Sequence, residues 1–389
     1  MRRARNVLHV LGPCLAFTVG TAASACTREA PHADAGTVLD APVVAEDVSI
    51  LWPLPTDASD TFPFTPRSEG GHGALVPKAV EETLPPLTTD TEREATYASL
   101  RLAAVRLDPC FARTDLADDC RAQIRLVFQP VRDATGSVES VDAALHVFFD
   151  VPRAELVSLV TTIHALRDPA ADGTTLGIHS RFASEGRKGT FGSALAQALM
   201  PSIGAARLRR VTFMALPVDK HEWVFGGTDV DGDTVAPVVP KGSTEARQRV
   251  AGSTSTDGSA IARTTFVAND DVRPALSGGV KALDDDDARA ALTAARRLED
   301  PTVHSPESTD CASCHLAHAA IVALGTRKSA DASTGPGVPS FTSNVRSAGS
   351  PPSSFRAFGW FGKEPSVSAR AANETSVVVD AFATLLRAR

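Results

Sequence analysis

Residues 310–315 read Asp-Cys-Ala-Ser-Cys-His and contain the pattern C-x-x-C-H. In this pattern two thiols add to the two vinyl groups of a haem, and the following histidine gives an imidazole nitrogen to the iron. With 6 Cys and 10 His in 389 residues, chance would produce the pattern about 0.002 times per chain. The spacing therefore predicts one covalent haem c, with Cys311 and Cys314 as thioether sites and His315 as proximal ligand.

The same cysteines allow other chemistry. Cys311 and Cys314 could form a disulfide or a redox-active dithiol. Together with His304 and His318 they could also provide four ligands in a tetrahedral zinc site. The compartment decides between these interpretations, and the N-terminus of the chain favours haem.

The first 26 residues have the order of an export signal. Three arginines lie within residues 2–5, residues 7–23 are mostly apolar, and Ala23-Ser24-Ala25 is a small-residue cleavage site. This pattern predicts a signal peptide over residues 1–25. Cys26 follows at once, which resembles a bacterial lipoprotein signal, although Ala23 stands where Leu is usual. We expect lipidation of Cys26, with ordinary cleavage and a free thiol as the alternative.

A lipid on Cys26 would anchor the protein to the periplasmic face of a bacterial membrane, most simply the outer membrane. Residues 26–47 are rich in Ala, Pro, Asp and Thr without an aromatic residue, which predicts a disordered tether. No later apolar run reaches the roughly 18 residues of a spanning helix. The net charge of −7 argues against a nucleic-acid partner.

Residues 48–260 are predicted to form an α+β domain of unknown role. Apolar residues alternate over 120–131, which indicates a strand, and residues 141–151 are predicted to form another. Pro152 starts a helix, because the apolar residues that follow recur at helical spacing up to residue 167. Cys110 and Cys120 lie ten residues apart between two predicted strands. An oxidising compartment permits a disulfide between them, with two unpaired thiols as the alternative.

Residues 283–389 are predicted to fold separately. A helix begins near the acidic run Asp284–Asp287, the C-x-x-C-H motif follows, then a long Ser/Gly/Pro segment and a C-terminal helix. This order resembles a small single-haem cytochrome c, which implies a mostly α-helical domain. The family often supplies a downstream Met as sixth iron ligand, but the Met residues here are at 1, 200 and 214.

The sixth ligand is therefore sought among the histidines. We expect His304, because residues 301–306 form an extended, Pro-bounded segment long enough to pass the haem edge. His318 follows His315 by one helical turn and cannot reach the opposite face of the haem.

These features predict an exported, lipid-anchored electron carrier that exchanges electrons with a redox partner protein, more an electron-transfer protein than an enzyme. One alternative is a haem peroxidase or gas-binding protein with an open sixth position. Another is a non-catalytic lipoprotein binding module. A single C-x-x-C-H motif excludes a multihaem wire, and the sequence contains no nucleotide-binding fingerprint or nucleophile elbow.

Overall fold

The computed structural model describes residues 41–88, 92–111, 116–117, 119–216, 222–239, 245–251, 262–263, 283–325, 341–351, 354–355 and 357–387. Contacts group residues Val38–Arg389 into one compact unit. The predicted signal peptide and Cys26 lie outside the described residues. The end of the predicted tether is described, and there α1 (Ala45–Val48) is a buried helix. Within the described part of the chain no helix is both long and apolar enough to cross a bilayer.

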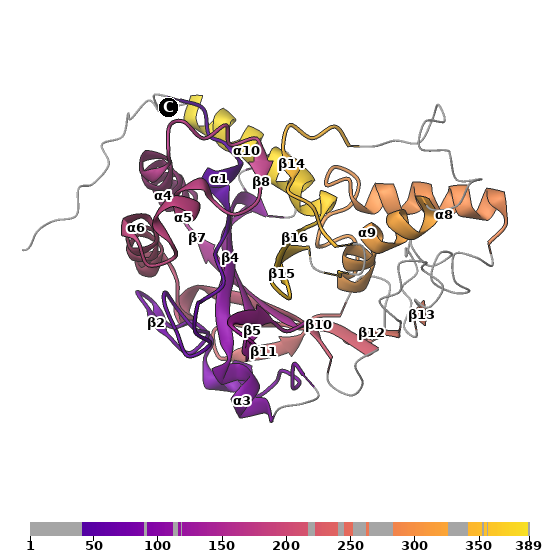
Figure 1. Cartoon of the computed structure of the whole chain (residues 1–389), viewed down its shortest axis with the longest axis horizontal. Helices are drawn as coiled ribbons and strands as arrows, with labels where there is room; N and C mark the ends of the chain where they lie inside the picture. The colour runs from indigo at the N-terminus through magenta and orange to yellow at the C-terminus, as the bar shows by residue number, and fades with distance from the viewer. Residues whose placement is uncertain are drawn as a thin grey trace, which may run out of the picture. The chain divides into compact units, whose positions relative to one another are not determined.

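The unit is built on an antiparallel sheet of ten strands (Figure 1). Eight strands follow one another across it: β1 (Ser49–Leu51), β4 (Leu100–Phe111), β5 (Arg121–Ala134), β7 (Ala144–Val151), β9 (Leu208–Ala215), β10 (Glu222–Asp231), β12 (Gln248–Ala251) and β13 (Ala262–Arg263). Two more strands join by hairpins: β6 (Ser137–Ser140) pairs with β5, and β11 (Thr234–Pro237) pairs with β10.

Period-two patterning gives the central strands two different faces. On β5 the predicted inward set is confirmed: Ala122, Ile124, Leu126 and Phe128 are buried in one core. Leu145, Val147 and Phe149 of β7 join them. This core is completed by α4 (Arg153–Leu166) and α6 (Thr190–Leu199), whose apolar residues recur at helical spacing. The N-cap of α4 is Pro152, as the sequence predicted.

Short elements surround this core. The helices are α2 (Lys78–Glu81), α3 (Arg93–Ala98), α5 (Ser180–Glu185), and the 3-10 turns η1 (Met200–Ser202) and η2 (Ala205–Arg207). The small strand pairs are β2 (Glu69–Gly70) with β3 (Gly73–Ala74), β8 (Thr175–Leu176) with β14 (Arg346–Ser347), and β15 (Phe358–Phe361) with β16 (Glu364–Val367).

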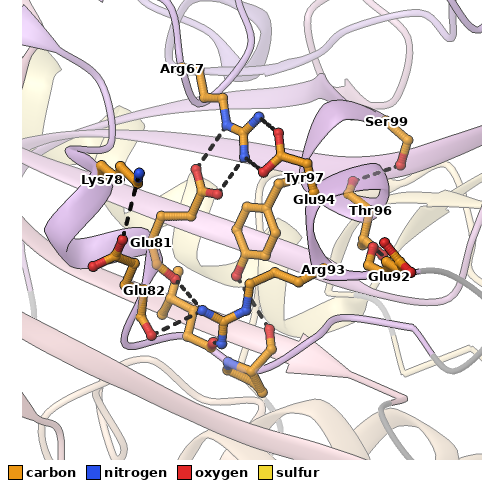
Figure 2. Close-up of polar contacts among 12 residues, drawn as sticks. Arg67, Lys78, Glu81, Glu82, Glu92, Arg93, Glu94, Thr96, Tyr97 and Ser99 are labelled. Atoms are coloured by element: carbon orange, nitrogen blue, oxygen red, sulfur yellow. Dashed lines mark hydrogen bonds and ion pairs between the residues drawn. The ribbon is translucent and has the colours of Figure 1, made fainter.

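A network of charged side chains fastens α2 to α3 (Figure 2). Arg67 lies between Glu81 and Glu94 and donates to both carboxylates. Arg93 donates to backbone carbonyls at the end of α2, including that of Glu82 at 3.0 Å. Both arginines bond to groups in or next to α2 and α3, so the network holds these two helices together.

The C-terminal segment corrects the predicted fold class. The expectation of an α+β domain followed by a small, mostly helical cytochrome c-like domain is wrong. Among the described residues, α8 (Asp285–Leu298), α9 (Cys311–Gly325) and α10 (Ala369–Arg387) are accompanied by β14, β15 and β16. The apolar faces of α8 and α9 share one core with β9, β10 and β12. The chain is a mixed fold in which α8 and α9 cover the second face of the sheet.

The physical reason is that a helix with one apolar stripe must bury it against another element. That core contains Leu292 and Leu298 of α8, Leu316 of α9, and Trp223 and Phe225 of the sheet. The predicted disulfide is confirmed, since Cys110 in β4 and Cys120 beside β5 are bonded with their Cα atoms 5.0 Å apart.

Candidate functional site

The C-x-x-C-H motif forms the first turn of α9, and two side chains fix its start. Asp310 acts as a cap, because its carboxylate accepts from the Ser313 amide at 2.9 Å and from the Ser313 hydroxyl at 2.6 Å. Gln248 of β12 accepts from the Ala312 amide at 3.1 Å. Two of the otherwise unpaired amides at this helix end are thus satisfied. The bond from Ala312 to Gln248 ties the start of the helix to the sheet.

Cys311, Cys314 and His315 line one cavity of about 180 Å³. Its opposite wall is the outward face of the central strands, and α10 closes one side. Cross-strand register builds this wall in rows. Arg106 of β4 pairs with Arg125 of β5, Arg125 with Phe148 of β7, and Phe148 with Arg210 of β9. In the adjacent row, His146 of β7 lies between Val127 of β5 and Thr212 of β9.

His315 is held by its backbone surroundings. Its Nδ1 donates to the Phe355 carbonyl at 2.6 Å, so Nε2 is the unprotonated nitrogen, the form in which a neutral imidazole can ligate a metal. The Phe355 ring packs on Trp223 at 4.7 Å, and Trp223 donates from Nε1 to Asp142 at 3.0 Å. The imidazole therefore has a fixed tautomer and orientation, which is the arrangement that metal-ligating histidines usually show.

His146 is the residue that the sequence interpretation missed. Its ring centre lies 6.2 Å from that of His315, with the two planes tilted by 34°. Both residues line the cavity, and both are half-buried. A signal was present in the sequence: His146 and Phe148 alternate with the core residues Leu145, Val147 and Phe149, so both face away from the α4 side of the sheet.

The cavity wall carries an excess of positive charge. Arg106, Arg125, Arg210 and Arg370 line it, against Glu307, Asp310 and Glu374. Arg106 and Arg370 both donate to Glu374, each at 2.7 Å. Burial alone would raise the pKa of Glu374, but the surrounding guanidiniums outweigh it and hold that pKa far below the usual carboxylate range.

Arg125 is the least satisfied of these cations. Its guanidinium stacks over Phe148 at 4.7 Å and over Phe111 at 5.6 Å. Within the described part of the chain it makes no hydrogen bond. Burial lowers the pKa of Arg125 to about 10. A half-buried guanidinium that faces another arginine across the strands favours an anionic group in the cavity.

Cys311 and Cys314 both carry free thiols. Burial is the main cause that raises their pKa values, to about 11 for Cys311 and about 12 for Cys314. The thiol form is therefore favoured over the thiolate that a redox-active dithiol uses. Among the described residues no group of three or more His, Cys, Asp or Glu side chains is spaced to hold a metal ion, so the four suggested zinc ligands are not brought together.

His304 and His318 lie away from the cavity lining. His304 is buried, and its carbonyl accepts from Arg370 at 2.7 Å. His318 follows on α9, with Nδ1 at 3.9 Å from the Glu299 carboxylate, and burial lowers its pKa. The predicted ligand His304 is thus separate from the cavity that Cys311, Cys314 and His315 share.

No protein-family model matches the sequence, and comparison with curated proteins and with solved structures gives no significant match. The function is accordingly argued from the residues of the site.

Proposed function

We propose that this protein is an exported, lipid-anchored c-type cytochrome that binds one covalent haem and exchanges electrons with a partner protein. The observation that carries the proposal is the C-x-x-C-H motif together with its surroundings. Cys311, Cys314 and His315 line one cavity, and the His315 Nδ1 donates to a backbone carbonyl at 2.6 Å. That bond directs Nε2 to act as the ligand.

When bound, the haem would supply an iron that cycles between ferric and ferrous states. Each wall of the cavity has a role toward it. The two thiols of Cys311 and Cys314 would tether the macrocycle, and His315 would ligate the iron. Phe111 and Phe148 provide apolar surface. Arg125, whose guanidinium lacks a hydrogen-bonded anion in the described structure, would pair with a haem carboxylate.

The cavity volume of about 180 Å³ is below the roughly 300–1,000 Å³ of typical ligand pockets. Haem binding therefore requires the cavity to widen. Its lining includes Val238 and Val239, at the end of the β10–β11 hairpin. Both residues follow β11, which pairs in the described sheet with β10 alone, so their displacement would leave the pairing of β9 with β10 unchanged.

The export and anchoring part of the proposal is supported by the sequence of residues 1–26. A confirmed disulfide between Cys110 and Cys120 is the bond expected in an oxidising compartment. Haem attachment to C-x-x-C-H also needs an exported chain, so the two parts of the proposal support each other.

The test is haem staining after denaturing electrophoresis of the protein produced in a bacterial periplasm. Wild type should retain haem under denaturing conditions, because thioether bonds survive them. The variant with Cys311→Ala and Cys314→Ala should lose the stain. A matched control carries Cys110→Ala and Cys120→Ala, which removes the other cysteine pair and should keep the stain. An unstained wild type, or a stained Cys311/Cys314 variant, would refute the proposal.

A further inference from the structure

We propose that His146 of β7 is the second axial ligand of the iron, which makes the site a bis-histidine centre closed to exogenous ligands. The inference rests on the proposed function, since it concerns the haem that Cys311 and Cys314 would carry. It names a residue that lies far from the motif in sequence and on another element. It also replaces His304 as the sixth ligand.

The spacing of the two imidazoles is the first argument. A metal–imidazole nitrogen bond is about 2.0 Å long, and a five-membered ring with bonds of about 1.3 Å places its nitrogen about 1.1 Å from its centre. Two imidazoles on opposite sides of one iron thus have centres about 6.2 Å apart. The ring centres of His146 and His315 are 6.2 Å apart. The spacing that axial ligation needs is already present.

The placement of each ring is the second argument. His315 is fixed through Nδ1 by the Phe355 carbonyl. His146 lies in the middle of β7, paired on one side with Val127 of β5 and on the other with Thr212 of β9. A residue in a central strand moves little, so His146 offers a preorganised ligand. His304, in contrast, follows the turn at residues 301–303 and is absent from the cavity lining.

The flanks of the two rings are the third argument. Phe225 of β10 lies 5.1 Å from the His315 ring, and Phe148 lies 6.5 Å from the His146 ring. The pair of imidazoles is therefore bordered by flat apolar groups. In the adjacent sheet row Arg106 and Arg210 are paired with Glu374 and Asp229, so Arg125 is the cation offered to an acidic substituent. This is the combination that a flat, apolar ligand with carboxylates at one edge requires.

A saturated iron has a functional consequence. With two histidines the iron has no open position for peroxide or a gas, so the site supports electron transfer and not substrate chemistry. Histidine in place of Met also gives a lower reduction potential than in Met-ligated cytochromes. The proposal thereby separates an electron carrier from the peroxidase and gas-binding alternatives.

The experiment compares His146→Ala with the matched control His304→Ala in the full chain, each with haem attached in the periplasm. Ferric wild type should give a low-spin electron paramagnetic resonance signal, and the ferrous form should not bind carbon monoxide. His146→Ala should lose the low-spin signal, bind carbon monoxide and regain the low-spin state when imidazole is added. His304→Ala should behave as wild type.

A second variant distinguishes loss of the ligand from misfolding of His146→Ala. His146→Met keeps a long side chain that can ligate iron, and it should keep the low-spin state with a raised midpoint potential. An unchanged low-spin signal in His146→Ala, a high-spin wild type, or an unchanged potential in His146→Met would overturn the assignment. Wild type without haem would refute the proposed function itself. A His146→Ala protein that carries haem and has the wild-type spectrum would refute only the assignment of His146 as ligand.

Discussion

Glu374 is the carboxylate that compensates the buried arginines of the cavity wall. Glu374→Gln tests how much this compensation contributes to the free energy of unfolding. The carboxylate accepts from Arg106 and from Arg370, each at 2.7 Å. The three side chains are largely buried, with 18% of Glu374, 9% of Arg106 and 4% of Arg370 exposed. Removing one partner of a buried ion pair costs about 3–5 kcal/mol, because the remaining charges lose their compensation.

We expect Glu374→Gln to lower the free energy of unfolding by about 3 kcal/mol, the low end of that range, because the Gln amide oxygen still accepts one hydrogen bond. The control is Glu364→Gln on β16, where the same change at an exposed glutamate should stay within about 0.5 kcal/mol of wild type. The assay is urea unfolding followed by far-ultraviolet circular dichroism, with equal haem content in all samples.

The effect should also depend on pH. The pKa of Glu374 in the folded protein lies far below its unfolded value of about 4.3. A group with a lowered folded pKa contributes stability above the unfolded pKa and loses it as the pH falls. The difference between wild type and Glu374→Gln should therefore be constant near neutral pH and shrink below about pH 4. A loss under about 1 kcal/mol at pH 7, or a difference that does not change with acid, would refute this reasoning.

Three further predictions concern other parts of the chain. Removing the disulfide with Cys110→Ala and Cys120→Ala should cost about 3 kcal/mol, as expected for a closed loop of this length; an unchanged urea midpoint would contradict this. Burial lowers the pKa of His179 to about 4. The free energy of unfolding should therefore decline as the pH drops from about 6.5, where the unfolded histidine takes up a proton, to about 4. His179→Asn should flatten that decline, and an equally steep pH profile would count against it. Cys26→Ser should move the protein from the membrane fraction to the soluble periplasmic fraction; a soluble wild type would exclude the anchor.

Local patterns in the sequence predicted much of the structure. Alternation placed Ala122, Ile124, Leu126 and Phe128 of β5 on the core face, and helical spacing located α4 after Pro152. The disulfide between Cys110 and Cys120 also followed from spacing and compartment. These features depend on neighbours in the chain, so a single sequence contains the information for them.

The wall of the cavity that the central strands form, with His146, could not be predicted from local sequence patterns. His146 and His315 approach each other only because α9 packs across the sheet, a contact between elements far apart in sequence. Residues 241–259 are rich in Gly, Ser and Thr, a composition typical of a loop or linker. Gln248 and Val250, however, lie in β12, where Gln248 holds the first turn of α9 and Val250 joins the shared core. An expectation that residues 283–389 fold separately directs the search for a ligand to His304 and away from His146.

The most direct test of the central claim is the pyridine haemochrome spectrum of the purified, exported wild type, with haem quantified per chain. A haem bound through two thioethers at Cys311 and Cys314 predicts the absorption band of haem c and one haem per polypeptide, resistant to extraction with acidic acetone. A chain without haem, or a haem that acid acetone extracts, would contradict the covalent site.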